Sequence, residues 1–523
     1  MAVNIPILVP LAPSLRKRFY EPVVLLFCLI FVHFKNNTTE APDLDTDASK
    51  SPKSAFHCFV NKLGQLCDSK RGGDTITAFG VLRPGNIEYR FASNNRDTAA
   101  LEQVKRYITG ILKTLAKTTS SKPGNKDEMH SQILRKALVF NRPRIEFYIK
   151  TFTDNCKFCI DMCQTEETDE GVAASDNLRI VKRLAVSASE ACIEDIEFAL
   201  RVEKLLVEIN RFHNSPSEEF IRSKARVDRD NVATPWSVLR HAAGRLLSYF
   251  IAVKVLISTS KRWPELFDDF EVTYVHSSGP GDTPSIRRTA SGIIGHMSSD
   301  PVTLEDYKQK LKEPQFSELD GKIKKSASKS EFQPIVHAEI TLLYSILKDT
   351  REAGEPLRFF EESNFGKYIG CSKPTCRLCW DFFQHHPEGV QVRASHQNLY
   401  YNWRLPDVFD HFADKERQVI LEQMIKPIRD ATFRAISDRV MRKKNDSRTT
   451  PSDPLVSTKD DGDDLASRMG QMDIASERDL DEDSSFERGS WTEVEERTFT
   501  SSPGSSSLEE LVDDEDDDGG AIL

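Results

Sequence analysis

The spacing of apolar residues divides the chain into segments of different periodicity. A polar, Pro-bearing stretch at 38–54 predicts a linker, and a run with helical spacing follows from Phe59 to Cys67. Two short β-rich runs come next, Thr75–Leu82 and Ile87–Ala92, separated by a four-residue turn. Two such runs around a short turn predict a β-hairpin.

Helical periodicity dominates the next part of the chain. Apolar residues recur every three or four positions in Leu101–Leu115, Ile133–Cys163 and Trp236–Ile257, and in a fourth stripe from Leu178 to Val207. This spacing is typical of amphipathic helices. We therefore predict an all-α domain or insertion at 97–267. A connecting loop region at 268–333 should follow, in which Asp269–Val275 forms one strand.

Mixed helix and strand signals return at 334–444, which ends in a long helical stretch from Val408 to Lys444. The last segment, 445–523, holds 24 acidic and 6 basic residues and few apolar ones, so it predicts a disordered acidic C-terminal tail. The other 444 residues hold 65 basic and 57 acidic side chains. No dense basic stripe appears in this mildly basic body, so its charge is not the footprint of a nucleic-acid-binding surface.

The first segment, 1–54, contains an apolar run of 13 residues, Pro22–Phe34, shortly after three basic residues. This order resembles a signal peptide, but the run is shorter than the roughly 20 residues that span a bilayer. No small-residue cleavage site follows it. Two interpretations stay open, a buried helix of the fold and a membrane or secretory segment.

Two segments combine residues that bind metals, PIVHAEITLLYSIL at 334–347 and YIGCSKPTCRLCWDFF at 368–383. His337 opens one predicted helix, and Cys376 and Cys379 lie one turn apart at the start of another. One imidazole and two thiols are a three-ligand zinc set that leaves a fourth position to water, as in catalytic sites. Glu339, two residues from His337, can reach that water and move its protons without binding the metal.

Each part alone has a simpler interpretation. A His-Ala-Glu tripeptide is usually only the start of a helix, and a single Cys-x-x-Cys is more often a structural zinc site or a pair of buried thiols. The two in this order, with a strand between them, are the signature of zinc-dependent base deaminases. Cys371 is either an alternative ligand or a buried thiol. A second cluster, Cys156, Cys159 and Cys163, lies on one helix face and fits packing better than a metal site.

These motifs and RASHQNLYYNWRLP at 393–406 resemble the fungal OTT-type deaminase-like family of the cytidine-deaminase-like superfamily. The resemblance implies an α/β fold, with a mixed sheet flanked by helices, and Zn2+ as the cofactor. It also implies that His337, Cys376 and Cys379 are the zinc ligands and Glu339 is the proton shuttle. One departure is that Thr375 separates Pro374 from the first motif cysteine, whereas many members of the superfamily have Pro directly before it.

A deaminase-like sheet normally begins with a helix and a hairpin, which precede the His-x-Glu helix. Our hypothesis is that residues 55–96 supply them and that the helical region is an insertion into a split core. The rival hypothesis places these residues in a separate N-terminal domain and takes an edge strand from Asp269–Val275. In several superfamily members an Asn at the end of the second strand contacts the substrate sugar, and Asn94 holds that position here.

Two further residues are expected to bind substrate, His396 and Trp403, which follow a predicted strand at Val390–Ser395. Aromatic side chains there could stack on a base. An aromatic cluster at the edge of the core is the simpler interpretation of the same residues.

The sequence therefore predicts a zinc-dependent hydrolase that deaminates a nucleobase, in a nucleoside, a nucleotide or a nucleic acid. The alternative is a catalytically inactive, zinc-binding scaffold that binds protein partners through the helical domain and the acidic tail. The intact motif favours the enzyme. Thiol ligands favour a reducing compartment, so we expect a cytoplasmic or nuclear location and no membrane partner.

Overall fold

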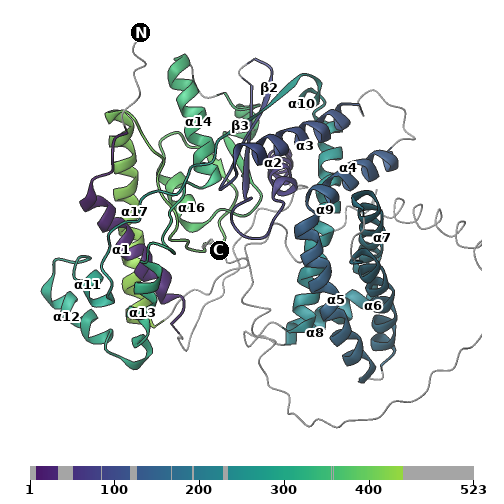
Figure 1. The fold of residues 1–523 in the computed structure, drawn as a ribbon, viewed down its shortest axis with the longest axis horizontal. Helices are drawn as coiled ribbons and strands as arrows, with labels where there is room; N and C mark the ends of the chain where they lie inside the picture. The colour runs from purple at the N-terminus through teal and green to yellow at the C-terminus, as the bar shows by residue number, and fades with distance from the viewer. Residues whose placement is uncertain are drawn as a thin grey trace, which may run out of the picture.

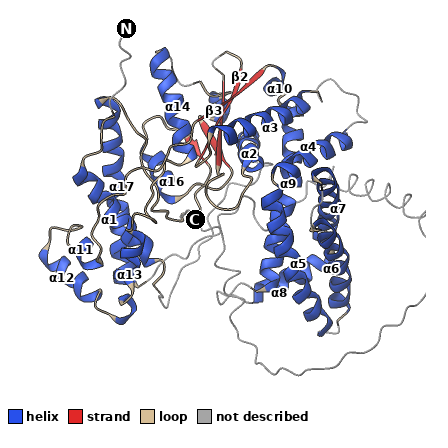
Figure 2. Cartoon of the chain, viewed as in Figure 1, coloured by secondary structure: helices blue, strands red, loops and turns tan. Residues whose placement is uncertain are grey.

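A computed structural model describes residues 8–32, 51–83, 85–117, 126–165, 168–190, 194–227, 234–354, 356 and 358–439. The predicted acidic tail at 445–523 and most of the predicted linker at 38–54 lie outside these residues. The described part is an α/β structure with one mixed sheet at its centre and helices on both sides (Figures 1 and 2). The predicted fold class is thereby confirmed.

The sheet has five strands in the order β3-β2-β1-β4-β5. Their bounds are β1 Thr77–Leu82, β2 Ile87–Ser93, β3 Phe270–Val275, β4 Tyr368–Cys371 and β5 Gln391–Val392. β1 is antiparallel to both of its neighbours, β2 and β4, whereas β3 and β5 extend the two edges in parallel pairs. The hairpin and the strand before the cysteine motif thus share one sheet, which is the arrangement that the split-core hypothesis requires. The edge strand that the rival hypothesis invoked is also present, as β3.

Alternating side chains of the strands enter two separate hydrophobic cores, because successive residues of a strand face opposite sides of a sheet. Phe79 and Phe91 pack on one face with α2 (Pro52–Cys67) and with the helices between residues 98 and 268, which we call the helical block. Ala78 and Ile369 pack on the other face with α14 (Ala338–Ala353) and α16 (Arg377–His385). The helices that begin at the metal-binding motifs therefore share one face of the sheet.

Two glycines let α2 lie unusually close to the strands. A Cβ atom on Gly64 of α2 would lie 2.6 Å from the carbonyl oxygen of Thr77 and 2.7 Å from the amide nitrogen of Ser372. A Cβ on Gly370 of β4 would lie 2.7 Å from a methyl group of Val60. These two residues set the distance between the first helix of the core and its central strands.

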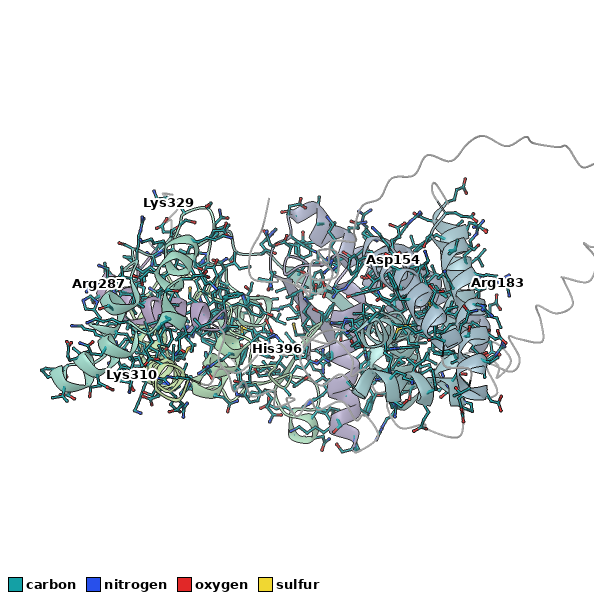
Figure 3. The ribbon with its side chains drawn as sticks, turned by 90° about the horizontal axis from the view of Figure 1, so that it is seen from below. Asp154, Arg183, Arg287, Lys310, Lys329 and His396 are labelled. Carbon is teal, nitrogen blue, oxygen red and sulfur yellow. The ribbon has the colours of Figure 1, made fainter. Side chains whose placement is uncertain are left out.

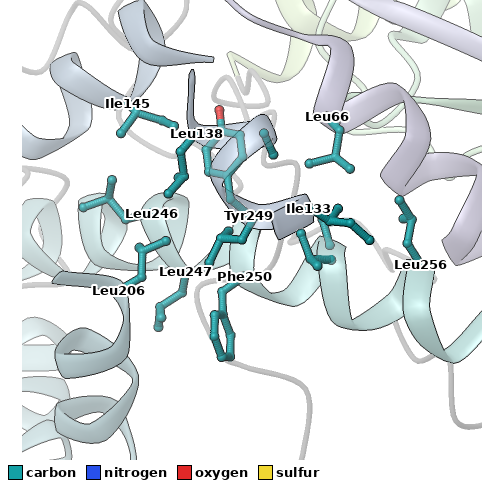
Figure 4. Close-up of a cluster of buried hydrophobic side chains, with 14 of the residues drawn as sticks. Leu66, Ile133, Leu138, Ile145, Leu206, Leu246, Leu247, Tyr249, Phe250 and Leu256 are labelled. Atoms are coloured by element: carbon teal, nitrogen blue, oxygen red, sulfur yellow. The ribbon is translucent and has the colours of Figure 1, made fainter. Parts of the chain in front are cut away.

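The helical block forms a lobe beside the sheet, at the right in Figure 1. Its helices are α3 Thr98–Ala116, α4 Lys126–Phe140, α5 Arg142–Thr165, α6 Asp169–Ala188, α7 Asp195–His213, α8 Pro216–Val227, α9 Pro235–Arg262 and α10 Glu265–Asp268. Figure 4 shows the apolar cluster in which Leu66 of α2 meets this block, represented by Ile133 of α4, Leu206 of α7 and Tyr249 of α9. The block and the face of the sheet that carries α2 therefore share one hydrophobic core.

Within the described part of the chain, α9 is the helix whose length and composition would suit a membrane span. Its most apolar window has a mean hydropathy of 1.4, and 67% of that window is buried inside the protein.

The N-terminal helix α1 (Pro13–Leu29) packs against the long C-terminal helix α17 (His411–Asp438), at the left in Figure 1. Arg18 of α1 makes a two-pronged ion pair with Glu422 of α17, with N–O distances of 2.7 and 2.8 Å. The apolar residues Val23–Leu26 are at most 1% exposed. Residues 22–29 of the apolar run are therefore part of a buried helix of the fold, as one of the two interpretations predicted.

Three predicted segments differ from the structure. The stripe from Leu178 to Val207 is wrong as one helix, because α6 ends at Ala188 and α7 begins at Asp195, after a break. Acidic residues at a helix start are favourable, and the acidic side chains within 194–197 lie at the start of α7.

The predicted loop region at 268–333 contains, besides β3, the helices α11 Ala290–Ile294, α12 Pro301–Lys310 and α13 Leu319–Ser326 and the short 3-10 helix η2 Pro314–Phe316. The strand predicted at Val390–Ser395 is shorter, because the chain after Val392 pairs with the loop before Cys376 instead.

Candidate metal centre and active site

The predicted ligands lie at the starts of two helices, as their spacing indicated. His337 is the N-cap residue of α14, and Cys376 is the N-cap residue of α16. Cys379, one turn into α16, donates its backbone N–H to the sulfur of Cys376 over 3.4 Å. Helix starts are favourable for thiolates because the backbone N–H groups and the helix dipole stabilise negative charge there.

The three side chains converge on one point. The Nδ1 atom of His337 lies 3.5 Å from the sulfur of Cys376 and 3.4 Å from the sulfur of Cys379. Zinc bonds are about 2.3 Å long to sulfur and about 2.05 Å to nitrogen. At tetrahedral angles, a nitrogen and a sulfur that bind the same zinc ion would therefore lie about 3.5 Å apart. The observed distances and the donor set therefore fit zinc. This is the one His, Cys, Asp and Glu group of metal-binding geometry found among the described residues.

The two thiols differ in acidity, and their surroundings explain why. Burial opposes ionisation of Cys376, but hydrogen bonds from Cys379 and the nearby His337 outweigh it and hold the pKa of Cys376 well below its usual value. Burial and the interaction with Cys376 raise the pKa of Cys379. The pair thus favours one thiolate even before a metal neutralises the charge.

Glu339 is buried in the first turn of α14, with 4% of its surface exposed. Burial raises the pKa of its carboxyl group, although the nearby His337 acts in the opposite direction. A carboxyl group that holds its proton nearer to neutral pH is suited to general acid–base catalysis. The structure brings Glu339 to the cluster without placing it among the three converging ligand atoms.

Cys371, the residue considered as an alternative ligand, lies outside the group of three converging ligand atoms. It ends β4, is 1% exposed, and lies close enough to the Glu339 carboxyl group for the two to interact electrostatically. Burial raises the pKa of Cys371, and the neighbouring carboxylate raises it further. Cys371 is therefore a neutral buried thiol beside Glu339, as one of its two interpretations held.

The motif RASHQNLYYNWRLP pairs with the segments that precede His337 and Cys376. Ile335, which lies before His337, pairs with the segment at Trp403 through its amide nitrogen and its carbonyl oxygen. Thr375, which lies before Cys376, pairs with Ser395 in the same way. The segment between 393 and 404 therefore fixes the relative position of both helix starts.

Trp403 is fully buried and supports a ligand. Its indole N–H donates a hydrogen bond of 3.3 Å to the sulfur of Cys379. Such a bond orients the sulfur and would stabilise the thiolate form that a metal requires. The predicted role of Trp403 in binding substrate stays a prediction, and the contact seen here is with a predicted metal ligand.

Asn94 and His396 also lie inside the protein, 3% and 2% exposed. The side-chain oxygen of Asn94 accepts the backbone N–H of Ala338 over 2.8 Å, and its amide donates to the carbonyl oxygen of Gly73 over 2.9 Å. Asn94 thereby ties the end of the hairpin to the start of the helix after His337. The Nδ1 atom of His396 accepts the backbone N–H of Asn398 over 2.9 Å.

Figure 3 shows where His396 lies within the whole molecule. It is found between the helical block, marked by Asp154 and Arg183, and the opposite end, marked by Arg287 and Lys310. Neither geometry nor burial assigns Asn94 or His396 to the substrate, so both stay predictions.

The second cysteine cluster packs inside the helical block. Cys156, Cys159 and Cys163 are buried on α5, and burial raises the pKa of Cys156 and of Cys159. Neutral buried thiols are what the packing interpretation requires.

Residues 336–407 match the family of OTT_1508-like deaminases. The match spans His337, Glu339, both cysteine ligands and Trp403, and it confirms the resemblance to a deaminase-like family. No curated protein sequence and no solved structure matches the chain significantly.

Proposed function

We propose that this protein is a zinc-dependent hydrolase that removes the amino group of a nucleobase, in a nucleoside, a nucleotide or a nucleic acid. The observation that carries the proposal is the convergence of His337, Cys376 and Cys379 beside Glu339. Support comes from the match of this segment to a deaminase-like family.

The three ligands would hold zinc, and Glu339 would do the proton chemistry. Zinc in such a site supplies an acidified water molecule as the nucleophile. Glu339 accepts a proton from the nucleophile, delivers it to the ring nitrogen and assists the departure of the amine. The indole of Trp403 would orient the sulfur of Cys379.

The variant Glu339→Gln tests this proposal, since it preserves the shape of the side chain but cannot exchange the proton. Ammonia release would be measured with cytosine, adenine and guanine nucleosides, their nucleotides and single-stranded oligonucleotides. We expect about one zinc per chain in wild type and variant alike. Activity should fall on the order of a hundredfold or more in the variant. Unchanged activity in Glu339→Gln would contradict the proposed role of Glu339 in proton transfer.

The same experiment separates the enzyme from the alternative, a zinc-binding scaffold. A wild-type protein that holds zinc but releases no ammonia from any of these substrates would favour the scaffold, with the helical block as its protein-binding surface. A reducing compartment, the cytoplasm or the nucleus, is part of the proposal, because free Cys376 and Cys379 must stay reduced.

A further inference from the structure

The N-terminal helix α1 contacts the residue that supports a predicted metal ligand. The hydroxyl of Tyr20 donates a hydrogen bond of 3.0 Å to the backbone carbonyl oxygen of Trp403, and the centre of the Phe19 ring lies 5.7 Å from that of the indole ring. Tyr20 and Phe19 are buried, with 5% and 1% of their surface exposed. α1 lies outside the segment 336–407 that matches the deaminase-like family. The matched segment is therefore held from outside at Trp403.

Trp403 contacts both halves of the metal centre. Its indole N–H is the donor to the sulfur of Cys379, and its ring also lies 6.4 Å from the ring of Phe382 on the same helix, α16. Its backbone segment pairs in parallel with Ile335, two residues before His337. A displacement of Trp403 would therefore act on a predicted cysteine ligand and on the segment that leads to the predicted histidine ligand.

The pairing with Ile335 does not use the carbonyl oxygen of Trp403. The amide of Ile335 donates to the carbonyl oxygen of Asn402 over 3.0 Å, and the amide of Arg404 donates to the carbonyl oxygen of Ile335 over 2.9 Å. A buried carbonyl oxygen needs a hydrogen-bond donor, and Tyr20 supplies one to Trp403. Burial raises the pKa of Tyr20, so its hydroxyl keeps the proton that it donates.

α1 is fixed to the protein by contacts that do not involve Trp403. Glu21, which is 1% exposed, accepts the backbone N–H of Arg287 over 3.2 Å, and its other carboxylate oxygen lies 3.0 Å from the Nδ1 atom of His296. The ion pair of Arg18 with Glu422 joins α1 to α17. Tyr20 and Phe19 therefore extend from a firmly held helix to the residue that they contact.

We propose that Tyr20 and Phe19 are positioning residues of the metal centre, which fix Trp403 and through it the sulfur of Cys379. The inference rests on the proposed function, because it needs the metal that the three predicted ligands would hold. Groups that hydrogen-bond to metal ligands set the orientation of the ligands and the affinity for the metal. The indole can set the direction of its hydrogen bond only while its own backbone and ring are held. α1 is thereby a component of the metal centre.

The variant Tyr20→Phe tests the proposal, because it removes the hydroxyl group and keeps the ring. Tyr89→Phe is the matched control. The hydroxyl of Tyr89, on β2, donates to the backbone carbonyl oxygen of Leu266 over 2.8 Å, and Tyr89 is fully buried in the hydrophobic core on the other face of the sheet. The two variants lose the same kind of hydrogen bond at similar burial, so a general loss of stability would affect both.

Zinc affinity of the full-length protein would be measured by competition with a chelator. The absorption bands of the Co2+-loaded protein would report the geometry of the thiolate ligands. Tyr20→Phe should bind zinc about threefold to tenfold more weakly than wild type, because partners that touch a ligand directly are worth about tenfold or more and Tyr20 acts one step further away. Its cobalt bands should shift, whereas Tyr89→Phe should match wild type in both measurements.

Combining Tyr20→Phe with Trp403→Phe tests whether Tyr20 acts through the indole. Residues that act independently have additive effects, whereas coupled residues do not. The effect of Tyr20→Phe on zinc affinity should therefore be smaller in the variant that lacks the indole N–H. Phe19→Leu keeps an apolar side chain but removes the ring, and it should weaken zinc binding in the same way. It decides the matter if circular dichroism shows that Tyr20→Phe does not fold.

The proposal is overturned if wild type binds zinc and both α1 variants bind it equally well, with unchanged cobalt bands. It is equally overturned if Tyr89→Phe weakens zinc binding as much as Tyr20→Phe does, or if the effect of Tyr20→Phe is undiminished without the indole. A folded wild-type protein that binds no zinc would instead contradict the proposed metal centre, and this inference with it. The two failures are therefore distinguishable.

Discussion

Replacing Gly64 with alanine tests how closely the first helix of the core must approach the sheet. Alanine is favoured over glycine inside a helix by about 1 kcal/mol. At this position, however, the new methyl group would lie 2.6 Å from the carbonyl oxygen of Thr77 and 2.7 Å from the amide nitrogen of Ser372. Both atoms belong to the backbone of the core and cannot rotate away. Overpacking of this kind costs about 1–3 kcal/mol, and two clashes with backbone atoms place Gly64 in the upper part of that range. After subtraction of the helix gain, we expect Gly64→Ala to lower the free energy of unfolding by about 1–2 kcal/mol.

Gly110→Ala is the matched control. Gly110 lies inside α3, and nothing lies within 4 Å of the position that its Cβ would occupy. The same substitution should therefore raise the free energy of unfolding by about 0.5–1 kcal/mol. Urea denaturation followed by circular dichroism would compare both variants with wild type. The reasoning is refuted if Gly64→Ala is as stable as Gly110→Ala.

Three further predictions concern single side chains. Trp403→Phe keeps an aromatic ring at this position but removes the hydrogen bond to Cys379, so a competing chelator should show zinc affinity lowered by about tenfold or more; unchanged affinity would contradict the supporting role of the indole. Asn94→Ala removes one buried and one partly buried hydrogen bond and should lower stability by about 2 kcal/mol in denaturant titrations, whereas lost activity with unchanged stability would point to substrate binding instead. Burial lowers the pKa of Lys62 from its ordinary value of 10.5 to about 8 in the folded protein. Between pH 8 and pH 10.5 the unfolded state therefore binds more protons than the folded state, so the stability of wild type rises as the pH increases across this range. Lys62→Gln should therefore be more stable than wild type by up to about 3 kcal/mol below pH 8, with the difference disappearing toward pH 10.5; a constant difference would contradict this account.

The parts of the structure that the sequence predicted are those that rest on local spacing. Helical periodicity located α3 and α9, and the turn between two β-rich runs located the hairpin of β1 and β2. The metal cluster was predictable because His337 and the two cysteines lie in short motifs whose spacing alone places them at helix starts.

The remainder depends on contacts between distant residues, which local spacing does not encode. The hydrogen bond from Trp403 to Cys379 requires the pairing of the chain before His337 with the chain around residue 403. Cys371 lies near Glu339 because β4 and α14 pack together.

The metal content of the purified protein tests the central claim most directly. Elemental analysis of wild type beside Cys376→Ser should find about one zinc per chain in wild type and little or none in the variant, because serine does not replace a thiolate ligand of zinc. Circular dichroism would establish that both proteins are folded. A folded wild-type protein without zinc, or a variant that keeps its full zinc content, would contradict the assignment of His337, Cys376 and Cys379 as a zinc site.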